Sequence, residues 1–352
     1  MAPIDTPYYS HDVHGPYELA DIGDLVLEEG PTLRGVQLAY QTLGTLNEAK
    51  DNAVLVTTWY SGNHSIMRDT YVGAGRALDP EKYFIVLVNQ LGSGLGTSPH
   101  TTDGPYGRGR WPRVRIGDDV VAQERFLRET FGIERLALVF GGSMGAQQTY
   151  EWAVRFPDKV ARAAALAGTA KNLDHCRILA QTFVDSMVSD PAYDDGFYAA
   201  SGDVHRGLRR HATTFALSGF STAFWNQEKW RDLGFNSADD FVAGFLEAYF
   251  LPMDPGDLVA MAWKWQHGDV SRHTGGDLAA ALGRITARTL VLPISTDRFF
   301  PPEDCAAEQA LIPGSTLRVI EDVHGHASLF ALSPTYSEQV DAALEELLAA
   351  DA

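Results

Sequence analysis

The stretch Leu136-Ala-Leu-Val-Phe-Gly141-Gly142-Ser143-Met144-Gly145-Ala146-Gln147 decides the fold. Its first five residues are apolar, as in a strand buried on both faces, and a helical pattern over Gly145–Phe156 follows. Between them, Gly141, Ser143 and Gly145 form the pattern G-x-S-x-G. In this position the pattern indicates a tight strand-to-helix turn that exposes the serine hydroxyl at the edge of a sheet. A glycine-rich turn with an incidental serine is the alternative, which the flanking strand and helix disfavour.

Outside this turn, short apolar runs alternate with helical patterns along the chain. Ala53–Thr58 and Tyr83–Asn89 are apolar on both faces, which is typical of strands inside a parallel sheet, whereas Val36–Thr42 alternates and predicts an exposed antiparallel strand. This alternation favours a mostly parallel α/β sheet with helices on both faces. The other predicted strands are Asp24–Leu27, Leu136–Phe140, Ala163–Ala167, Thr289–Pro293 and Leu317–Glu321, and further helices are expected over Asp118–Thr130 and Pro334–Ala349.

Residues 169–285 interrupt the alternation, because they contain no convincing strand but several helical patterns. A segment of this kind between two strands predicts a helical cap over the carboxyl edge of the sheet. We therefore expect a core formed by residues 1–168 and 286–352 and a cap formed by residues 169–285. The helices predicted in the cap are Cys176–Ser189, Val204–Ser218, Ala238–Phe250 and Asp257–Gln266.

Charge and cysteine content exclude several classes of protein. With 28 Lys+Arg against 46 Asp+Glu the net charge is −18, which disfavours binding to nucleic acid or to anionic lipid. The two cysteines, Cys176 and Cys305, lie far apart and predict neither a disulfide framework nor a zinc ribbon. No signal peptide is recognisable, and no apolar run approaches the ~18 residues of a membrane span. We expect a cytoplasmic protein without a cofactor or metal.

A nucleophilic serine needs a base, and the base needs a carboxylate that orients it. After a G-x-S-x-G turn the expected chain order is Ser, Asp or Glu, then His. Asp297 follows a predicted strand and should reach the same sheet edge as Ser143, with Asp304 as the competing acid. His324 and His326 both follow the last predicted strand, and we favour His326 as the base because it begins the approach to the final helix.

Two backbone N–H groups should hold the negative oxygen that forms during acyl transfer. One belongs to Met144, and the other is expected from Tyr60, in the loop after the predicted strand Ala53–Thr58. An aromatic loop that only packs on the cap is the alternative for Tyr60. Nine of the eleven histidines lie outside this machinery and are expected mostly at the surface or in the cap. Four of these are interpreted as solvated rather than as metal ligands, namely His205, His211, His267 and His273.

Together these motifs resemble the homoserine O-acetyltransferase-like branch of the α/β-hydrolases over nearly the whole chain. The segments that carry the resemblance are Asn52-Ala-Val-Leu-Val, Gly75-Arg-Ala-Leu-Asp, Lys82-Tyr-Phe-Ile-Val, Gly142-Ser-Met-Gly-Ala-Gln-Gln, Glu151-Trp-Ala, Asp297 before Phe-Pro-Pro, and Gly325-His326. The resemblance implies the α/β-hydrolase fold, a triad of Ser143, Asp297 and His326, and an oxyanion position around Tyr60.

Departures from that family bear on the substrate. Its transferases usually carry an arginine in the first cap helices that binds the carboxylate of the amino acid, and this chain has Ala212 there, with Arg209 and Arg210 as nearby cations that could replace it. Ala327 follows the catalytic histidine in place of the usual aspartate, and Tyr60-Ser61-Gly62 replaces Leu-Thr-Gly. Four aromatic neighbours suggest an apolar pocket for the alcohol: Phe215, Phe220, Phe224 and Trp225.

These features predict a serine carboxylesterase that hydrolyses short-chain, above all acetyl, esters of small alcohols through an acyl-serine. One alternative is an O-acetyltransferase that moves an acyl group from acyl-CoA to a small alcohol. Another is a binding protein on the hydrolase fold without catalysis, which the intact set of three residues disfavours. The expected partner is a small ester, with acyl-CoA added for the transferase, and the expected assembly is a monomer or homodimer.

Overall fold

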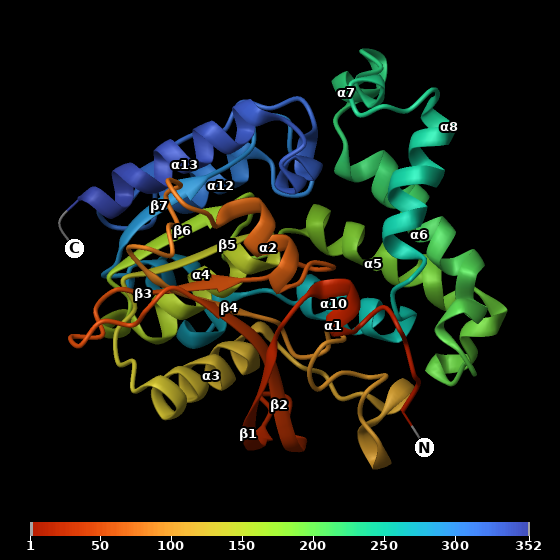
Figure 1. Ribbon diagram of the computed structural model, residues 1–352, viewed down its shortest axis with the longest axis horizontal. Helices are drawn as coiled ribbons and strands as arrows, with labels where there is room; N and C mark the ends of the chain where they lie inside the picture. Colours follow the sequence, from red (N-terminus) through yellow and green to blue (C-terminus); the bar gives the residue numbers. More distant parts are fainter. Residues whose placement is uncertain (1–2, 351–352) are drawn as a thin grey trace.

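An eight-stranded sheet forms the centre of the protein, whose computed structural model describes residues 3–350 (Figure 1). The strand order is β1-β2-β4-β3-β5-β6-β7-β8. The pairs β1–β2 and β2–β4 are antiparallel, and all later neighbours are parallel, which confirms the predicted mostly parallel α/β sheet. The strands are β1 (Glu18–Val26), β2 (Thr32–Leu43), β3 (Ala53–Thr57), β4 (Phe84–Val88), β5 (Leu138–Gly142), β6 (Arg162–Leu166), β7 (Arg288–Leu292) and β8 (Thr316–Leu317).

Helices cover both faces of this sheet, and α3 and α13 lie on opposite sides of it (Figure 1). Outside residues 169–285 the helices are α1 (His11–His14), α2 (His64–Tyr71), α3 (Ile116–Phe126), α4 (Met144–Arg155), α12 (Pro302–Gln309) and α13 (Pro334–Ala349). Leu55 packs in the layer of α3 and α4, whereas its neighbours Val54 and Val56 pack in the layer of α2 and α13. Because both layers exclude water, the central strands are apolar at every position, as the sequence predicts.

Three strands differ in part from the prediction. β1 (Glu18–Val26) is longer than the predicted Asp24–Leu27. β2 is antiparallel as expected but only partly exposed, since Gln37 is exposed whereas Val36, Leu38 and Tyr40 are buried in the core. The last strand is shorter than the predicted Leu317–Glu321, with only an isolated bridge from Ile320 to Ile294 beyond β8. Ile320 donates its N–H to the carbonyl of Pro293, but proline has no N–H to continue the ladder.

Between β6 and β7 the described chain forms helices and turns without a strand, as predicted for residues 169–285. We call these residues the helical insertion; α5 packs against α6 and α10 within it. Figure 1 shows α5, α6, α7 and α8 to one side of the sheet. The helices of the insertion are α5 (Asp174–Val188), α6 (His205–Gly219), α7 (Thr222–Asn226), α8 (Ala238–Phe241), α9 (Ala248–Phe250), α10 (Pro255–Gln266) and α11 (Leu278–Leu282), with a π-helical segment (Val242–Glu247) joining α8 to α9. Within residues 3–350, every helix is too short or too polar to cross a bilayer.

A fully buried ion pair joins the helical insertion to the helical layer of the sheet. Lys264 of α10 donates to Asp119 of α3 at 2.5 Å and to the carbonyl of Leu91 at 2.6 Å. The two charged side chains are 1% and 0% exposed. Removing one partner would therefore leave the other charge buried without compensation.

We expect Lys264→Met to lower the free energy of unfolding by about 3–5 kcal/mol, because an unpaired carboxylate would remain in the interior. The double variant Asp119→Leu/Lys264→Met should recover much of that loss, since no charge is then buried. Lys229→Met is the matched control: its partner is Asp232 in an exposed pair, which contributes at most about 1 kcal/mol. Urea denaturation measures all three, and equal losses for Lys264→Met and Lys229→Met would contradict the prediction.

Candidate active site

Ser143 lies in a strained turn between β5 and α4. Its backbone has φ 55° and ψ −120°, a region in which a non-glycine residue costs about 1–3 kcal/mol. The turn also approaches the end of β3 closely. A Cβ atom on Gly141 would lie 2.2 Å from Oγ1 of Thr57, and one on Gly145 would lie 2.7 Å from the carbonyl oxygen of Thr57. The two glycines of the G-x-S-x-G pattern are thus required by the close contact of this turn with Thr57 at the end of β3.

Hydrogen bonds connect Ser143, His326 and Asp297, which come from three distant parts of the chain. Nε2 of His326 lies 2.9 Å from Oγ of Ser143, and Nδ1 of His326 lies 2.7 Å from Oδ2 of Asp297. All three residues are at most 5% exposed. Asp297 follows β7, and His326 lies in the 3₁₀ turn Gly325–Phe330. The arrangement allows the imidazole to accept the serine proton while the carboxylate orients the ring.

Asp297 is held by its own loop. Its Oδ1 accepts hydrogen bonds from the N–H groups of Phe299 at 2.7 Å and Phe300 at 3.2 Å, which leaves Oδ2 for His326. The ring of Phe299 stacks on the imidazole, with the centroids 4.3 Å apart. Asp304, the competing acid, lies in the first turn of α12, and Asp297 is the carboxylate that bonds His326.

His324 has a different partner. Its Nδ1 lies 2.6 Å from Oδ1 of Asp322, and its ring packs against Phe224 of α7. Burial alone would raise the pKa of Asp322, but hydrogen bonds from His324, Ser333 and Ser328 hold it at about 2. The ionised Asp322 therefore fixes the loop in which His326 sits, and it is His326 rather than His324 that lies at the serine.

The two predicted oxyanion donors lie at the serine. Met144 is the first residue of α4, where N–H groups have no partner within the helix. Tyr60 lines the same cavity as the serine. Side-chain amides of Gln90 and Gln148 donate to the carbonyl of Thr58 at 2.8 Å and 3.0 Å, which fixes the loop before Tyr60. The donor role of both N–H groups stays a prediction.

A small, mainly aromatic cavity opens at the serine. Its volume of about 20 Å³ exceeds the roughly 10–15 Å³ that one water molecule needs. Half of the residues in its wall, including Trp59, Trp265 and Phe330, are not predicted from the sequence as site residues. Trp59 and Phe330 could have been found as close neighbours of predicted site residues, whereas nothing local marks Trp265. The cavity is lined by Trp59, Tyr60, Ser61, Ser143, Phe215, Trp265, Phe299, His326, Leu329 and Phe330.

Of the four aromatic residues expected to form the alcohol pocket, the cavity wall includes Phe215. The prediction is wrong for the others, because α6 ends at Gly219 and the chain then changes direction. Phe220 and Phe224 pack against Phe241 at ring distances of 5.2 and 5.3 Å, and Trp225 joins the same cluster. The three rings pack within the helical insertion, and Phe224 contacts His324.

Positive charge is directed away from this cavity. Arg209 forms an ion pair with Glu247, and Arg210 donates to the carbonyl of Ser186 at 3.1 Å. Both arginines are exposed, whereas Ala212 is fully buried. No lysine or arginine occurs among the described residues that line the cavity. A negatively charged acceptor would find no cation there.

Four of the nine other histidines are at most 4% exposed. Three of them, His14, His64 and His100, lie outside the helical insertion and differ from the expected surface or cap position, whereas His211 lies in the insertion but is buried rather than solvated. Polar side chains or aromatic rings enclose each of these four, and sequence periodicity does not reveal such long-range partners. Of the three other histidines interpreted as solvated, His205 is exposed, whereas His267 and His273 are half-buried. The buried four and their neighbours are His14 with Asn63, His64 with Asn89, His100 with Asp257, and His211 among Tyr60, Phe183 and Phe250.

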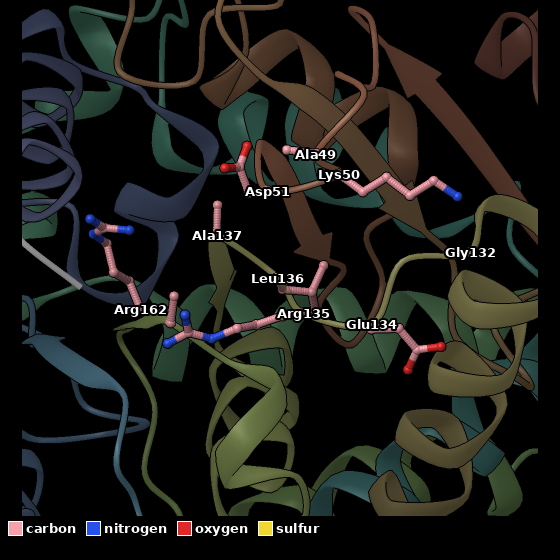
Figure 2. A pocket seen from close by; sticks show the side chains of 10 residues that line it. Ala49, Lys50, Asp51, Gly132, Glu134, Arg135, Leu136, Ala137 and Arg162 are labelled. Atoms are coloured by element: carbon pink, nitrogen blue, oxygen red, sulfur yellow. The ribbon is translucent and has the colours of Figure 1, made fainter.

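A wider groove of about 430 Å³ lies elsewhere, near the amino ends of β3, β5 and β6 (Figure 2). Lys50, Asp51, Arg135 and Arg162 are among the residues that line it. Its described lining includes no serine, histidine or cysteine, so this groove offers no nucleophile of the serine or cysteine type. The chemistry therefore concentrates at the small cavity beside Ser143.

The chain is similar to known proteins over nearly its full length. A family model described as alpha/beta hydrolase fold matches residues 60–330. The crystal structure of an acetylester hydrolase from Corynebacterium glutamicum is 56% identical and has a TM-score of 0.98, covering 99% of this chain and 100% of its own. The ethyl acetate hydrolase of Pseudomonas veronii is 52% identical over 98% of this chain and 99% of its own length. A homoserine O-acetyltransferase from Thermobifida fusca is 34% identical over 92% of this chain and 91% of its own length.

The segment matched by the family model begins at Tyr60 and includes Ser143, Asp297 and His326. It spans the strained serine turn, the helical insertion and the loop after β7 that carries the carboxylate. The sheet order, the turn and the family match agree, and the chain therefore belongs to the α/β-hydrolase fold family.

Proposed function

We propose that the protein is a serine carboxylesterase that hydrolyses acetyl esters of small uncharged alcohols through an acyl-Ser143 intermediate. The hydrogen-bonded chain from Ser143 through His326 to Asp297 carries this proposal, because it ends at a cavity with room for a small group only. The similarity to an acetylester hydrolase and to an ethyl acetate hydrolase supports the acetyl group as the acyl part.

In the proposed reaction, His326 removes the proton from Ser143 as its Oγ attacks the ester carbonyl carbon. The N–H groups of Met144 and Tyr60 then hold the negative oxygen, and Asp297 stabilises the protonated imidazole. The C–O bond to the alcohol breaks, and the alcohol leaves with the proton from His326. Water then attacks the carbonyl carbon of the acyl-serine while His326 takes the proton of the water. The bond between this carbon and Oγ breaks, His326 returns a proton to Oγ, and acetate is released.

Water is favoured over an amino acid as the acceptor because the cavity has no cation in its described lining. A charge-assisted contact to the carboxylate of homoserine is worth about 1.5–3 kcal/mol, and Ala212 cannot provide it. The second candidate is an O-acetyltransferase with acyl-CoA as donor, which the relative from Thermobifida fusca favours. The orientation of Arg209 toward Glu247 is the observation that argues against it.

Product analysis separates the two candidates. With acetyl-CoA and homoserine as substrates, we expect little O-acetylhomoserine. With p-nitrophenyl acetate, we expect rapid release of acetate, and added homoserine should not reduce the amount of acetate formed. The Thermobifida fusca relative, assayed in parallel, is the positive control for acyl transfer. If O-acetylhomoserine forms faster than free acetate, the protein is a transferase and the esterase proposal is wrong.

We further propose that residues 169–285 act as a cap on a core of residues 1–168 and 286–352. Phe215 and Trp265 of the helical insertion line the cavity at the serine, and the Lys264–Asp119 pair fastens the insertion to α3, which supports this role.

The net charge of −18 favours a protein that stays dispersed at neutral pH. It supports our proposal that the protein acts in the cytoplasm, as a monomer or homodimer, on small diffusing esters.

A further inference from the structure

His211 is a fully buried histidine whose ring nitrogens have no hydrogen-bond partner in the described part of the chain. It lies in the middle of α6, and the rings of Phe183 and Phe250 stand edge-on to it at 4.7 and 4.4 Å. Its third aromatic neighbour is Tyr60, at 5.7 Å. The hydroxyl of Tyr60 is also buried and also lacks a partner among the described residues.

Three polar atoms without partners at one place are costly. Each such buried group destabilises a protein by about 1–3 kcal/mol, so folded proteins retain few of them. Among the other polar side chains around the serine, the amide of Gln148 donates to Thr58 and the hydroxyl of Tyr249 donates to the carbonyl of Ser61 at 2.9 Å, whereas Oε1 of Gln90 and Nε1 of Trp265 also lack a partner among the described residues. The unsatisfied pair of His211 and Tyr60 therefore points to a ligand that supplies the missing hydrogen bonds.

The chemistry of the pair restricts that ligand to a neutral group. Burial lowers the pKa of His211 to about 3 and raises the pKa of Tyr60 well above its ordinary value, so both side chains are uncharged at neutral pH. A neutral imidazole offers one donor and one acceptor, and a phenol can act as either. A hydroxyl group, which also donates and accepts, matches this pair better than a carboxylate.

Tyr60 connects His211 to the cavity of the nucleophile. Tyr60 lines the cavity that contains Ser143, and the ring of Tyr60 contacts His211 directly. Phe215 connects the two in a second way, since it lines the cavity and packs against Phe250, the neighbour of His211. His211 thus lies directly behind the cavity wall, in contact with Tyr60, which lines the cavity.

We propose that His211 and Tyr60 bind a hydroxyl group on the alcohol part of the ester, so that preferred substrates are acetates of alcohols with a second, free hydroxyl. This inference rests on the proposed esterase function and names the substrate class of the same site. The two side chains make no bond to the reacting atoms; they determine which alcohol is held beside Ser143.

The test compares 2-hydroxyethyl acetate with ethyl acetate, which differ by one hydroxyl group, on the full-length protein. His211→Phe removes both nitrogens, and we expect the ratio of kcat/KM for the hydroxylated ester to that for ethyl acetate to fall about 5- to 150-fold. Tyr60→Phe should lower the same ratio. His205→Phe makes the same replacement at an exposed position of α6 and should leave the ratio at its wild-type value.

The ratio distinguishes recognition from packing. Equal losses on both esters in His211→Phe would overturn the inference, because His211 would then only support the fold. Wild-type kcat/KM on both esters in His211→Phe would also overturn the inference, since the two nitrogens would then not contact the substrate. If His211→Phe does not fold, Tyr60→Phe decides the question with the loss of one oxygen atom. A wild-type protein that hydrolyses neither ester would instead refute the esterase function itself.

Discussion

Ser143→Ala is expected to lower kcat for ester hydrolysis by about 10⁵–10⁶-fold, since this residue supplies the oxygen that carries the acyl group in the proposed intermediate. The variant keeps the two oxyanion N–H groups, so a small residual rate over water should remain. Alanine has a Cβ atom as serine does, so the backbone strain at φ 55° should remain in the variant. We therefore expect the variant to fold with a free energy of unfolding close to that of the wild type.

Initial rates with p-nitrophenyl acetate and covalent labelling together check this result. A fluorophosphonate should modify the wild-type protein at Ser143 and should fail to modify Ser143→Ala. Ser189→Ala, at an exposed serine after α5, serves as the matched control and should be labelled like the wild type. Labelling that survives in Ser143→Ala would show that another residue is the nucleophile.

His326→Ala should lower kcat by about 10³-fold or more, whereas His324→Ala should cost far less. The reason is geometric: Nε2 of His326 lies 2.9 Å from Oγ of Ser143, while His324 bonds Asp322 instead. His324→Ala removes one hydrogen bond from Asp322 and loosens the loop that carries His326, so its effect should appear mainly in stability.

Activity and thermal unfolding, measured on both histidine variants, separate the two roles. His326→Ala should be inactive with a nearly unchanged Tm, and His324→Ala should be active with a lowered Tm. Asp304→Asn and Asp297→Asn extend the comparison to the acids, with the larger loss of activity expected for Asp297→Asn. A greater loss of activity for His324→Ala than for His326→Ala would show that the roles are reversed.

The serine turn and the sheet could be predicted because their signals are local. The pattern around Ser143 is required by a contact to Thr57, and the central strands are apolar because two helical layers cover them. The helix Pro334–Ala349 was predicted with its observed bounds, since it begins at a proline after Ser333 and has no interruption. The choice of Asp297 and His326 followed from chain order and from the strand that precedes each.

What the sequence could not show depends on contacts between distant residues. The burial of His211 arises from rings on α5, α9 and the loop after β3, none of which is near it in the chain. The early end of β8 depends on Pro293 of the neighbouring segment. Phe220 and Phe224 turn away from the cavity because of where α6 ends, which helical periodicity alone does not determine.

The central claim, hydrolysis through an acyl-Ser143 intermediate, is tested most directly by rapid-quench mass spectrometry of the protein mixed with p-nitrophenyl acetate. This ester acylates quickly because its leaving group is activated, so the acyl-enzyme should accumulate in a burst. We predict one acetyl group on the peptide that contains Ser143, formed together with the burst of p-nitrophenol and lost as acetate when the ester is consumed. A full burst and turnover without acetyl on Ser143, or with acetyl on another residue alone, would contradict the account.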